Sequence, residues 1–304
     1  MTAARIVVLS GPTASGKSGL ALSLARVFPL EIVNADSLQV YRHMDIGTAK
    51  PSLEERGEVP HHLIDVADPD ETYDAGRYVG EAEGAIAGIL ARGKVPMVVG
   101  GTGMYIRALL RGLDPLPSDP EVRRSLERRW AEEGGGSLHS ELARVDPETA
   151  ARVHPSDRIR VVRALEIFAV TGVPPGRARS AWGGAGKYRH LFLALWPDRE
   201  TMRRRIDART EEMFAKGLLE EVRGLLDRGY GRDLKPMGAL GYRHAVAHLR
   251  NGVPLRETID AVKRDTRRYG KRQVTWLSAE PEALRLSPEE SFRSAREKVK
   301  MYLF

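Results

Sequence analysis

The sequence predicts an α/β fold: a parallel sheet with helices on both faces, built on a phosphate-binding loop and carrying a helical insertion domain. Short apolar runs alternate with helical patterns over residues 6–110, as is typical of βαβ units. Residues 11–18 read Gly-Pro-Thr-Ala-Ser-Gly-Lys-Ser and fit the pattern G-x-x-x-x-G-K-[ST]. They stand between an apolar run and a helical pattern, the context that this motif needs. The expected core is therefore similar to that of P-loop NTPases.

Five apolar runs are the expected strands: Ile6–Leu9, Glu31–Ala35, His62–Val66, Val95–Val99 and His190–Leu195. Helical patterns lie between most of them, at Lys17–Val27, Ala75–Ala91 and Gly103–Leu110. Alternation of this kind places helices against the faces of a parallel sheet.

The last two expected strands are separated by about 90 residues, too many for a simple crossover between neighbouring strands. We therefore expect residues 1–113 and 190–304 to form the core and residues 114–189 to form an insertion. Three helical patterns lie in the insertion, at Glu121–Glu133, Leu138–Val145 and Asp157–Thr171. From Arg199 to the end the chain reads as helices only.

The composition narrows the functional class. Hydrophobic residues make up 42% of the 304 residues and charged residues 29%, which indicates a globular chain. The absence of cysteine excludes disulfides, zinc–thiolate sites and thiol nucleophiles. No apolar run reaches about 18 residues and the first strand leaves no room for a signal peptide, so we expect a cytoplasmic protein with no membrane partner. The net charge of +7 favours a polyanionic partner. A monomer is the simplest expectation.

The glycine-rich loop predicts a phosphate or pyrophosphate site. Its glycines let backbone N–H groups converge on an anion, and the following helix N-terminus adds positive potential. Lys17 supplies a mobile cation, and the hydroxyl of Ser18 is placed to reach Mg²⁺. An acidic residue that closes an apolar strand, as ATPases use for Mg²⁺, is poorly matched. The loop alone does not identify the molecule that carries the phosphate.

Two polar residues follow expected strands, at the edge where open α/β sheets bind ligands. Asp36 ends the second run, so its carboxylate should face the same crevice as Lys17. Thr102 lies in Gly-Gly-Thr-Gly after the fourth run, where glycines permit close backbone approach. Simpler roles also fit: Asp36 as a turn or helix-capping aspartate, and Thr102 as part of a plain turn.

A basic segment near the C-terminus favours contact with a nucleic-acid backbone. Residues 263–272 contain six cations and one acid. On a helix the cations align at i, i+4 spacing in two stripes, one with Arg264, Arg268 and Arg272, the other with Lys263, Arg267 and Lys271. Like charges this close are costly unless an anion compensates them, which favours a phosphate-binding surface over a solvated face.

The chain resembles the bacterial tRNA dimethylallyltransferases over nearly its whole length. The most specific matches beyond the loop are Asp-Ile-Gly-Thr-Ala-Lys-Pro at residues 45–51 and Lys-Arg-Gln-Val-Thr-Trp at residues 271–276. Further matches lie at residues 35–41, 60–65, 99–105, 154–157, 163–166 and 241–243. Members of this family transfer a five-carbon prenyl group from dimethylallyl diphosphate to N6 of the adenosine 3′ of the anticodon.

This resemblance implies a role for each matched residue. The diphosphate is held by the loop residues Gly11, Thr13, Ala14, Ser15, Gly16, Lys17 and Ser18, with Mg²⁺ at Ser18. The catalytic residues are Asp36, which takes the proton from N6, Thr102 at the extruded base and Arg223 at the diphosphate. The residues that contact tRNA are Ser37, Leu38, Gln39, Arg123, Arg160, Arg163, Tyr242, Arg243, Arg267, Arg268, Lys271, Arg272 and Gln273. Gly238 departs from the family pattern, because relatives often carry a polar or basic residue there.

Three alternatives remain open. A P-loop small-molecule kinase would use Asp36 as the base on a hydroxyl, but it leaves the insertion and the basic segment unexplained. A prenyltransferase of free adenine nucleotides would share the site, but the basic insertion and C-terminal segment favour tRNA. A nucleic-acid-binding module with a vestigial loop is disfavoured by the intact Lys17, Ser18 and Asp36.

Overall fold

The computed structural model describes residues 3–113, 116–178, 186–287 and 291–304. The chain divides into two compact units, one formed by Met1–Leu110 with Lys187–Phe304 and the other by Arg111–Gly186. We call them the core unit and the helical unit and describe each by itself.

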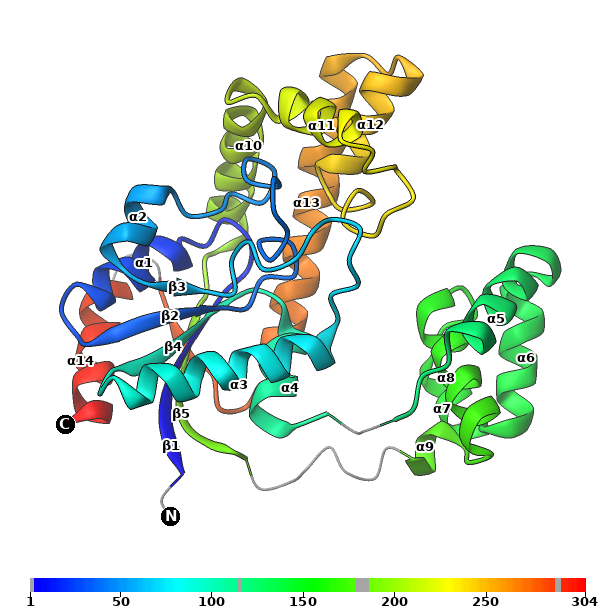
Figure 1. The fold of residues 1–304 in the computed structure, drawn as a ribbon, viewed down its shortest axis with the longest axis horizontal. Helices are drawn as coiled ribbons and strands as arrows, with labels where there is room; N and C mark the ends of the chain where they lie inside the picture. Colours follow the sequence, from blue (N-terminus) through cyan, green and yellow to red (C-terminus); the bar gives the residue numbers. More distant parts are fainter. Residues whose placement is uncertain (1–2, 114–115, 179–185, 288–290) are drawn as a thin grey trace. The chain divides into compact units, whose positions relative to one another are not determined.

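A six-stranded parallel sheet forms the centre of the core unit (Figure 1). Its strand order is β3-β2-β4-β1-β5-β6, and every neighbouring pair is parallel. The strands are β1 (Ala4–Ser10), β2 (Leu30–Asn34), β3 (His61–His62), β4 (Val95–Gly100), β5 (Tyr188–Leu195) and β6 (Leu284–Leu286). Parallel pairing requires crossovers, so helices must pack on the sheet faces.

Both faces of the sheet are covered. On one face α1 (Lys17–Ala25) and α14 (Ser291–Leu303) pack against inward residues of β1 such as Val7 and Leu9. On the other face α3 (Ala75–Ala91) and α4 (Gly103–Arg111) bury their apolar sides against Ile6 and Val8. This arrangement confirms the predicted α/β class with helices on both faces of a parallel sheet.

The remaining helices of the core unit come mostly from its C-terminal half. They are α10 (Arg199–Ala215), α11 (Leu218–Asp227), α12 (Tyr242–Asn251) and α13 (Leu255–Ser278), with the short α2 (Leu53–Glu58) near the start of the chain. Helix α13 packs against α10 and α12. Cations of α13 therefore come close to acidic residues of α10, as described below.

Two sequence-based expectations about strands are wrong. The run His62–Val66 is a strand only at His61–His62, because Leu63 (φ 63°) and Asp65 (φ 57°) adopt left-handed conformations that end an extended segment. The region after Arg199 also contains a strand, since Leu284–Leu286 pairs with β5. Three residues are too few to show a strand period.

The helical unit contains α5 (Pro120–Glu133), α6 (Gly135–Val145), α7 (Pro147–Arg152), α8 (Arg158–Thr171) and α9 (Pro175–Ala178). Its own core includes Leu126, Leu138, Leu142, Val161 and Leu165. Of the expected insertion, residues 114–115 and 179–185 lie outside the described residues. No helix of the described chain has the length and apolarity needed to cross a membrane.

Candidate active site

The phosphate loop, residues 11–18, connects β1 to α1. Ala14 (φ 60°) and Gly16 (φ 92°) are both left-handed, and Gly16 is the residue from which α1 starts. Backbone that alternates in this way turns successive N–H groups toward one point and forms an anion-binding nest. Gly11 is required for close packing, because a Cβ there would lie 2.6 Å from the hydroxyl oxygen of Ser15. The loop is therefore shaped to receive a phosphate.

Lys17 is a cation without a protein partner. Within the described chain no hydrogen bond or ion pair holds its ammonium group, although the residue is only partly exposed. Burial lowers the pKa of Lys17 to about 8, with Arg209 acting in the same direction and Asp36 opposing it. A desolvated, unpaired ammonium gains most from an added anion.

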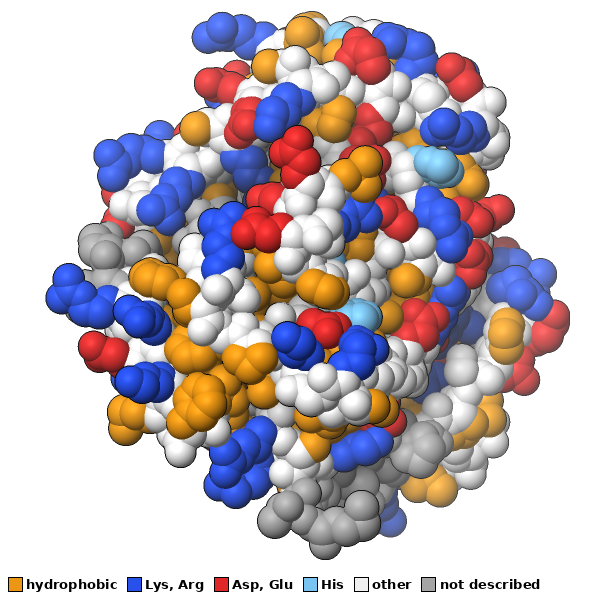
Figure 2. Space-filling model, turned by 60° about the vertical axis from the view of Figure 1, so that its left-hand side comes forward, with side chains coloured by type: hydrophobic (Ala, Val, Ile, Leu, Met, Phe, Trp, Pro, Cys, Tyr) orange, Lys and Arg blue, Asp and Glu red, His pale blue; other side chains and the backbone are white. Residues whose placement is uncertain are grey.

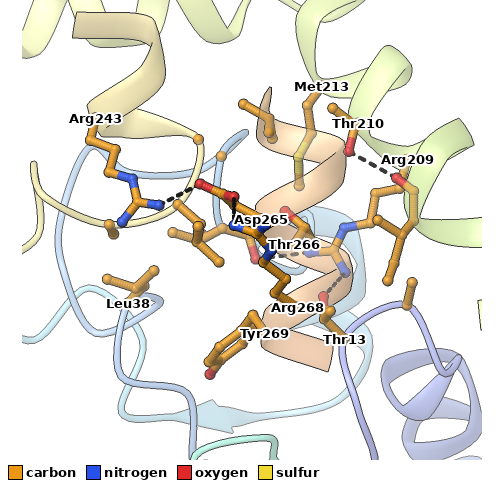
Figure 3. Close-up of a pocket in the computed structure, with 18 of the residues that line it drawn as sticks. Thr13, Leu38, Arg209, Thr210, Met213, Arg243, Asp265, Thr266, Arg268 and Tyr269 are labelled. Carbon is orange, nitrogen blue, oxygen red and sulfur yellow. Dashed lines mark hydrogen bonds and ion pairs between the residues drawn. The ribbon is translucent and has the colours of Figure 1, made fainter. Parts of the chain in front are cut away.

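Three hollows share Arg209 in their walls. An inner cavity of about 80 Å³ is lined by Lys17, Ser18, Asp36, Arg209 and Tyr269, among others. The loop-side opening extends from it past residues 14–19 and Lys50. The helix-side opening, of about 520 Å³, extends past α12 and α13 (Figure 3). The inner cavity thus shares wall residues with both openings.

Arg209 is one of two arginines of α10 at the phosphate loop, and sequence analysis missed both; the other, Arg205, donates from Nη1 to the Ser15 carbonyl at 3.1 Å. The Nη1 of Arg209 lies 3.4 Å from the Thr13 hydroxyl and its Nη2 3.4 Å from the Thr48 carbonyl (Figure 3). Burial lowers the pKa of Arg209, and the charge of Asp36 opposes that shift. The available signal was a cation on the buried face of α10, beside Ile206 and Thr210.

The structure places Arg223, which was predicted to lie at the diphosphate, away from the phosphate loop. Arg223 lies on α11, where its side chain is half exposed and its Nη1 is 3.8 Å from Glu220. It lines none of the three hollows. The motif that suggested Arg223 lies on α11, whereas the helix that faces the phosphate loop is the preceding one, α10.

Asp36 is held in place by the backbone that follows β2. Its Oδ1 accepts hydrogen bonds from the N–H groups of Leu38 (2.9 Å) and Gln39 (3.4 Å). Its Oδ2 has no hydrogen-bond partner among the described residues, and the carboxylate lines the inner cavity. One oxygen thus orients the side chain while the other is available to a ligand.

Thr102 supports Asp36 rather than lining the cavity. Its hydroxyl accepts the N–H of Ser37 at 3.0 Å, and its own N–H donates to the Ala35 carbonyl at 3.2 Å. The end of β4 must come close for this, and a Cβ at Gly100 would lie 2.1 Å from the Ala35 carbonyl oxygen. The hydroxyl keeps its own proton as a donor, so the predicted contact of Thr102 with a base stays a prediction.

Two residues expected to contact tRNA are used inside the protein. Gln273 is buried; its Oε1 accepts the N–H of Thr13 at 2.8 Å and its Nε2 donates to the Gly101 carbonyl at 3.0 Å. Tyr242 is fully buried and donates its hydroxyl to Glu221 at 2.7 Å. Tyr242 is enclosed by the protein and Gln273 holds the phosphate loop from the wall of the inner cavity, so contact of either residue with tRNA stays a prediction.

The cations of α13 differ in accessibility. Arg267 pairs with Asp207 and Lys263 with Glu211, both acids of α10, so this stripe is largely neutralised inside the protein. Arg268 is 69% exposed, with Asp265 at 3.5 Å, and Lys271 and Arg272 are exposed too. Arg268, Arg272 and Arg243 line the helix-side opening. In the face shown in Figure 2, Lys and Arg lie among acidic side chains instead of forming one patch.

In the helical unit the predicted arginines also differ. Arg123 and Arg163 both bind the buried carboxylate of Glu166, at 2.7 and 2.8 Å. Arg163 also donates to the carbonyls of Leu116 and Pro117. Arg160 is 69% exposed, with only Asp157 at 3.5 Å. Arg160 is thus the freest of the three to reach a partner.

A divalent cation fits this site only together with a ligand. The described residues contain no group of three or more His, Asp or Glu side chains that could hold a metal. Ser18 is exposed at the start of α1, and it shares the inner cavity with Asp36. Mg²⁺ commonly keeps several waters and binds through one or two protein oxygens plus substrate phosphates, so this sparse set is compatible with it.

The parallel sheet, the phosphate loop and a carboxylate facing the loop define a P-loop group-transfer enzyme. The chain belongs to the IPP transferase family, whose model matches residues 39–280. It is 48% identical over 290 residues to tRNA dimethylallyltransferase 1 of Pelobacter propionicus, covering 95% of this chain and 94% of the relative. It is 51% identical to tRNA dimethylallyltransferase of Geobacter metallireducens, covering 92% and 91%.

Solved structures show the same relationship. The full-length tRNA isopentenylpyrophosphate transferase of Bacillus halodurans matches with a TM-score of 0.73 at 35% identity, covering 98% of this chain and 96% of that one. A eukaryotic dimethylallyltransferase acting on tRNA matches with a TM-score of 0.81 at 29% identity, covering 97% and 77%. The family resemblance expected from the sequence is confirmed, and with it the prediction of an enzyme.

Proposed function

We propose that this protein transfers a dimethylallyl group from dimethylallyl diphosphate to N6 of the adenosine 3′ of the anticodon in tRNA, releasing diphosphate. The observation that carries the proposal is the inner cavity, which brings Lys17, Arg209 and Asp36 together between two openings. Cations for a leaving diphosphate and a base for an amine proton thus share one site. The reaction is proposed to take place in the cytoplasm, with the protein acting as a monomer.

The phosphate loop receives the diphosphate. Its N–H groups, Lys17 and Arg209 surround the place where negative charge grows as the bond between C1 of the prenyl group and oxygen breaks. Charges held in position before the reaction stabilise a departing anion more than solvent does. When bound, Mg²⁺ would be held by Ser18 and the diphosphate oxygens and would supply further neutralisation of that charge.

Asp36 acts on the adenine amine. The lone pair of the exocyclic N6 is delocalised into the ring, so the amine is a poor nucleophile. The free Oδ2 of Asp36 accepts one N6 proton while N6 forms its bond to C1 of the prenyl group. The N–H groups of Leu38 and Gln39 hold the carboxylate at Oδ1, and Thr102 holds the preceding backbone.

tRNA approaches through the helix-side opening. An anticodon-loop base must leave its stack to reach an enclosed cavity, as other base-modifying enzymes require. Arg243, Arg268 and Arg272 line this opening and Lys271 is exposed nearby on α13. These cations contact backbone phosphates, which position the substrate without reading its sequence. Arg160 of the helical unit supplies a further contact.

The test is an incubation with two labelled donors. Dimethylallyl diphosphate labelled in the prenyl group should transfer its label to total tRNA and leave AMP unlabelled. ATP labelled in its γ-phosphate should transfer no label to tRNA, to AMP or to a mixture of small-molecule acceptors. Transfer of phosphate from ATP would indicate a kinase, and transfer of the prenyl group to AMP alone would indicate an enzyme of free adenine nucleotides.

A further inference from the structure

We infer that Glu221 is a positioning residue that clamps the backbone of residues 45–47 and thereby holds Arg209 and the wall of the loop-side opening in place. The inference rests on the proposed function only in its kinetic consequence. Glu221 touches no substrate; it acts through the loop that it holds.

The clamp is a carboxylate that accepts three consecutive backbone N–H groups. Glu221 Oε2 accepts from Asp45 at 2.8 Å and from Ile46 at 2.6 Å, and Oε1 accepts from Gly47 at 3.1 Å. Three successive N–H groups that converge in this way form a nest for an anion. The chain fills this nest with its own side chain from α11.

Tyr242 completes the clamp from α12. Its hydroxyl donates to Glu221 Oε1 at 2.7 Å. Burial, followed by the charge of Glu221, raises the pKa of Tyr242, so the hydroxyl keeps its proton and stays a donor. The ring packs on Gly47, where a Cβ would lie 2.6 Å from ring carbons. Only glycine at residue 47 lets the loop come this close.

The clamped loop leads directly to Arg209. The next residue, Thr48, is buried, and its carbonyl accepts from Arg209 Nη2 at 3.4 Å and from Gln39 Nε2 at 3.1 Å. At the far end Lys50 is buried and binds Asp65 at 2.7 Å. The segment is therefore fixed at both ends, and its middle carries the carbonyl that orients the arginine facing the phosphate loop.

The clamp therefore predicts a selective effect on the diphosphate. Without it the Thr48 carbonyl is free to shift, and Arg209 loses one of its two contacts on the cavity wall. Hydrogen-bond donors that are not preorganised bind a ligand less tightly, because they must be ordered when the ligand binds. Most contacts proposed for tRNA lie on α13, and Arg243 of α12 is held by Asp265 of α13 at 2.7 Å, so these contacts should be unaffected.

The experiment compares Glu221→Gln with Glu220→Gln, a matched control on the same helix that removes the same charge from an exposed side chain. Isothermal titration with inorganic pyrophosphate and Mg²⁺ measures diphosphate affinity without any need for turnover. Glu221→Gln should weaken that affinity roughly ten-fold, because the charged acceptor of three backbone N–H groups is lost and the loop is no longer preorganised. The KM for dimethylallyl diphosphate should rise in parallel, while the KM for tRNA stays constant and Glu220→Gln behaves as the wild type.

Tyr242→Phe is the second variant, because it keeps the carboxylate and removes a single donor; it should show a smaller effect in the same direction. A lower melting temperature with unchanged pyrophosphate affinity in both variants would overturn the inference and leave Glu221 a stabilising residue only. If the wild type binds pyrophosphate but does not prenylate tRNA, the proposed function fails while the titration still tests the clamp.

Discussion

The guanidinium of Arg209 lies 3.4 Å from the hydroxyl of Thr13, although 196 residues separate them in the sequence. This contact brings α10 to the phosphate loop and places a second cation beside Lys17. In the proposed mechanism, stabilisation of the departing diphosphate depends on this position of Arg209.

Replacing Arg209 should impair the use of the prenyl diphosphate. Arg209→Gln should lower kcat/KM for dimethylallyl diphosphate roughly 10–100-fold, because a charged donor aimed at the leaving group is lost. Arg223→Gln is the matched control, since it removes the same charge from a half-exposed site on α11, and it should leave the rate within about two-fold of wild type. Steady-state kinetics with fixed tRNA measure both. A large loss in Arg223→Gln would restore that residue to the site.

The contrast between Arg209 and Arg223 shows what the sequence could predict. The phosphate loop and Asp36 were found because their chemistry lies in contiguous residues next to predicted strands. Arg209 lies on a helix that contacts the loop only in the tertiary structure, and no local sequence pattern predicts that contact. Gln273 and Tyr242 lie in recognisable motifs, yet both are buried. A motif identifies a residue but does not predict whether its side chain faces a ligand or the protein interior.

Elements of the fold were predictable where the hydrophobic periodicity extends over many residues. Ala75–Ala91 was expected as a helix and is one, because its buried residues recur at helical spacing. The strand expected at His62–Val66 was wrong because an apolar run does not reveal the left-handed backbone of Leu63 and Asp65. The edge strand Leu284–Leu286 depends on pairing with β5 and has no signal of its own.

The reaction should lose efficiency above about pH 8. Burial lowers the pKa of Lys17 from 10.5 to about 8, so the free enzyme carries this charge below that pH and loses it above. The value of kcat/KM for dimethylallyl diphosphate, which reports free-enzyme groups, should fall as pH rises through 8. In Lys17→Arg the guanidinium stays charged, and this fall should disappear even if the overall rate is lower. The same fall in Lys17→Arg would assign the titration to another group.

Gln273 should matter for the diphosphate and not for tRNA. Gln273→Leu removes the acceptor for the Thr13 N–H and the donor to the Gly101 carbonyl, and an unsatisfied buried group costs about 1–3 kcal/mol. We expect weaker pyrophosphate binding and lower thermal stability. The salt dependence of tRNA binding, measured by filter binding, should equal that of the wild type. A shallower dependence would mean that Gln273 contacts the nucleic acid.

Arg268 should contact tRNA phosphate, whereas Arg267 should not. Contacts to phosphate release counterions, with a log–log salt slope of about −0.7 per contact for single strands. Arg268→Ala should therefore make the slope shallower by up to about one unit and weaken substrate and non-substrate tRNAs alike. Arg267→Ala is the comparison, because that side chain is tightly paired with Asp207 and only 35% exposed, whereas Arg268 is 69% exposed. Arg267→Ala should lower stability and leave the slope unchanged; equal slopes in both variants would refute the distinction.

In the proposed reaction, Asp36 removes a proton from adenine N6 in tRNA while the diphosphate leaves from the phosphate loop. The most direct measurement is mass spectrometry of nucleosides from tRNA incubated with dimethylallyl diphosphate and either wild type or Asp36→Asn. We predict N6-isopentenyladenosine 3′ of the anticodon with the wild type, formed about 10²–10⁴-fold more slowly by Asp36→Asn, with tRNA affinity nearly unchanged. Prenylation by Asp36→Asn at the wild-type rate, or a product modified at another atom of the base, would contradict the account.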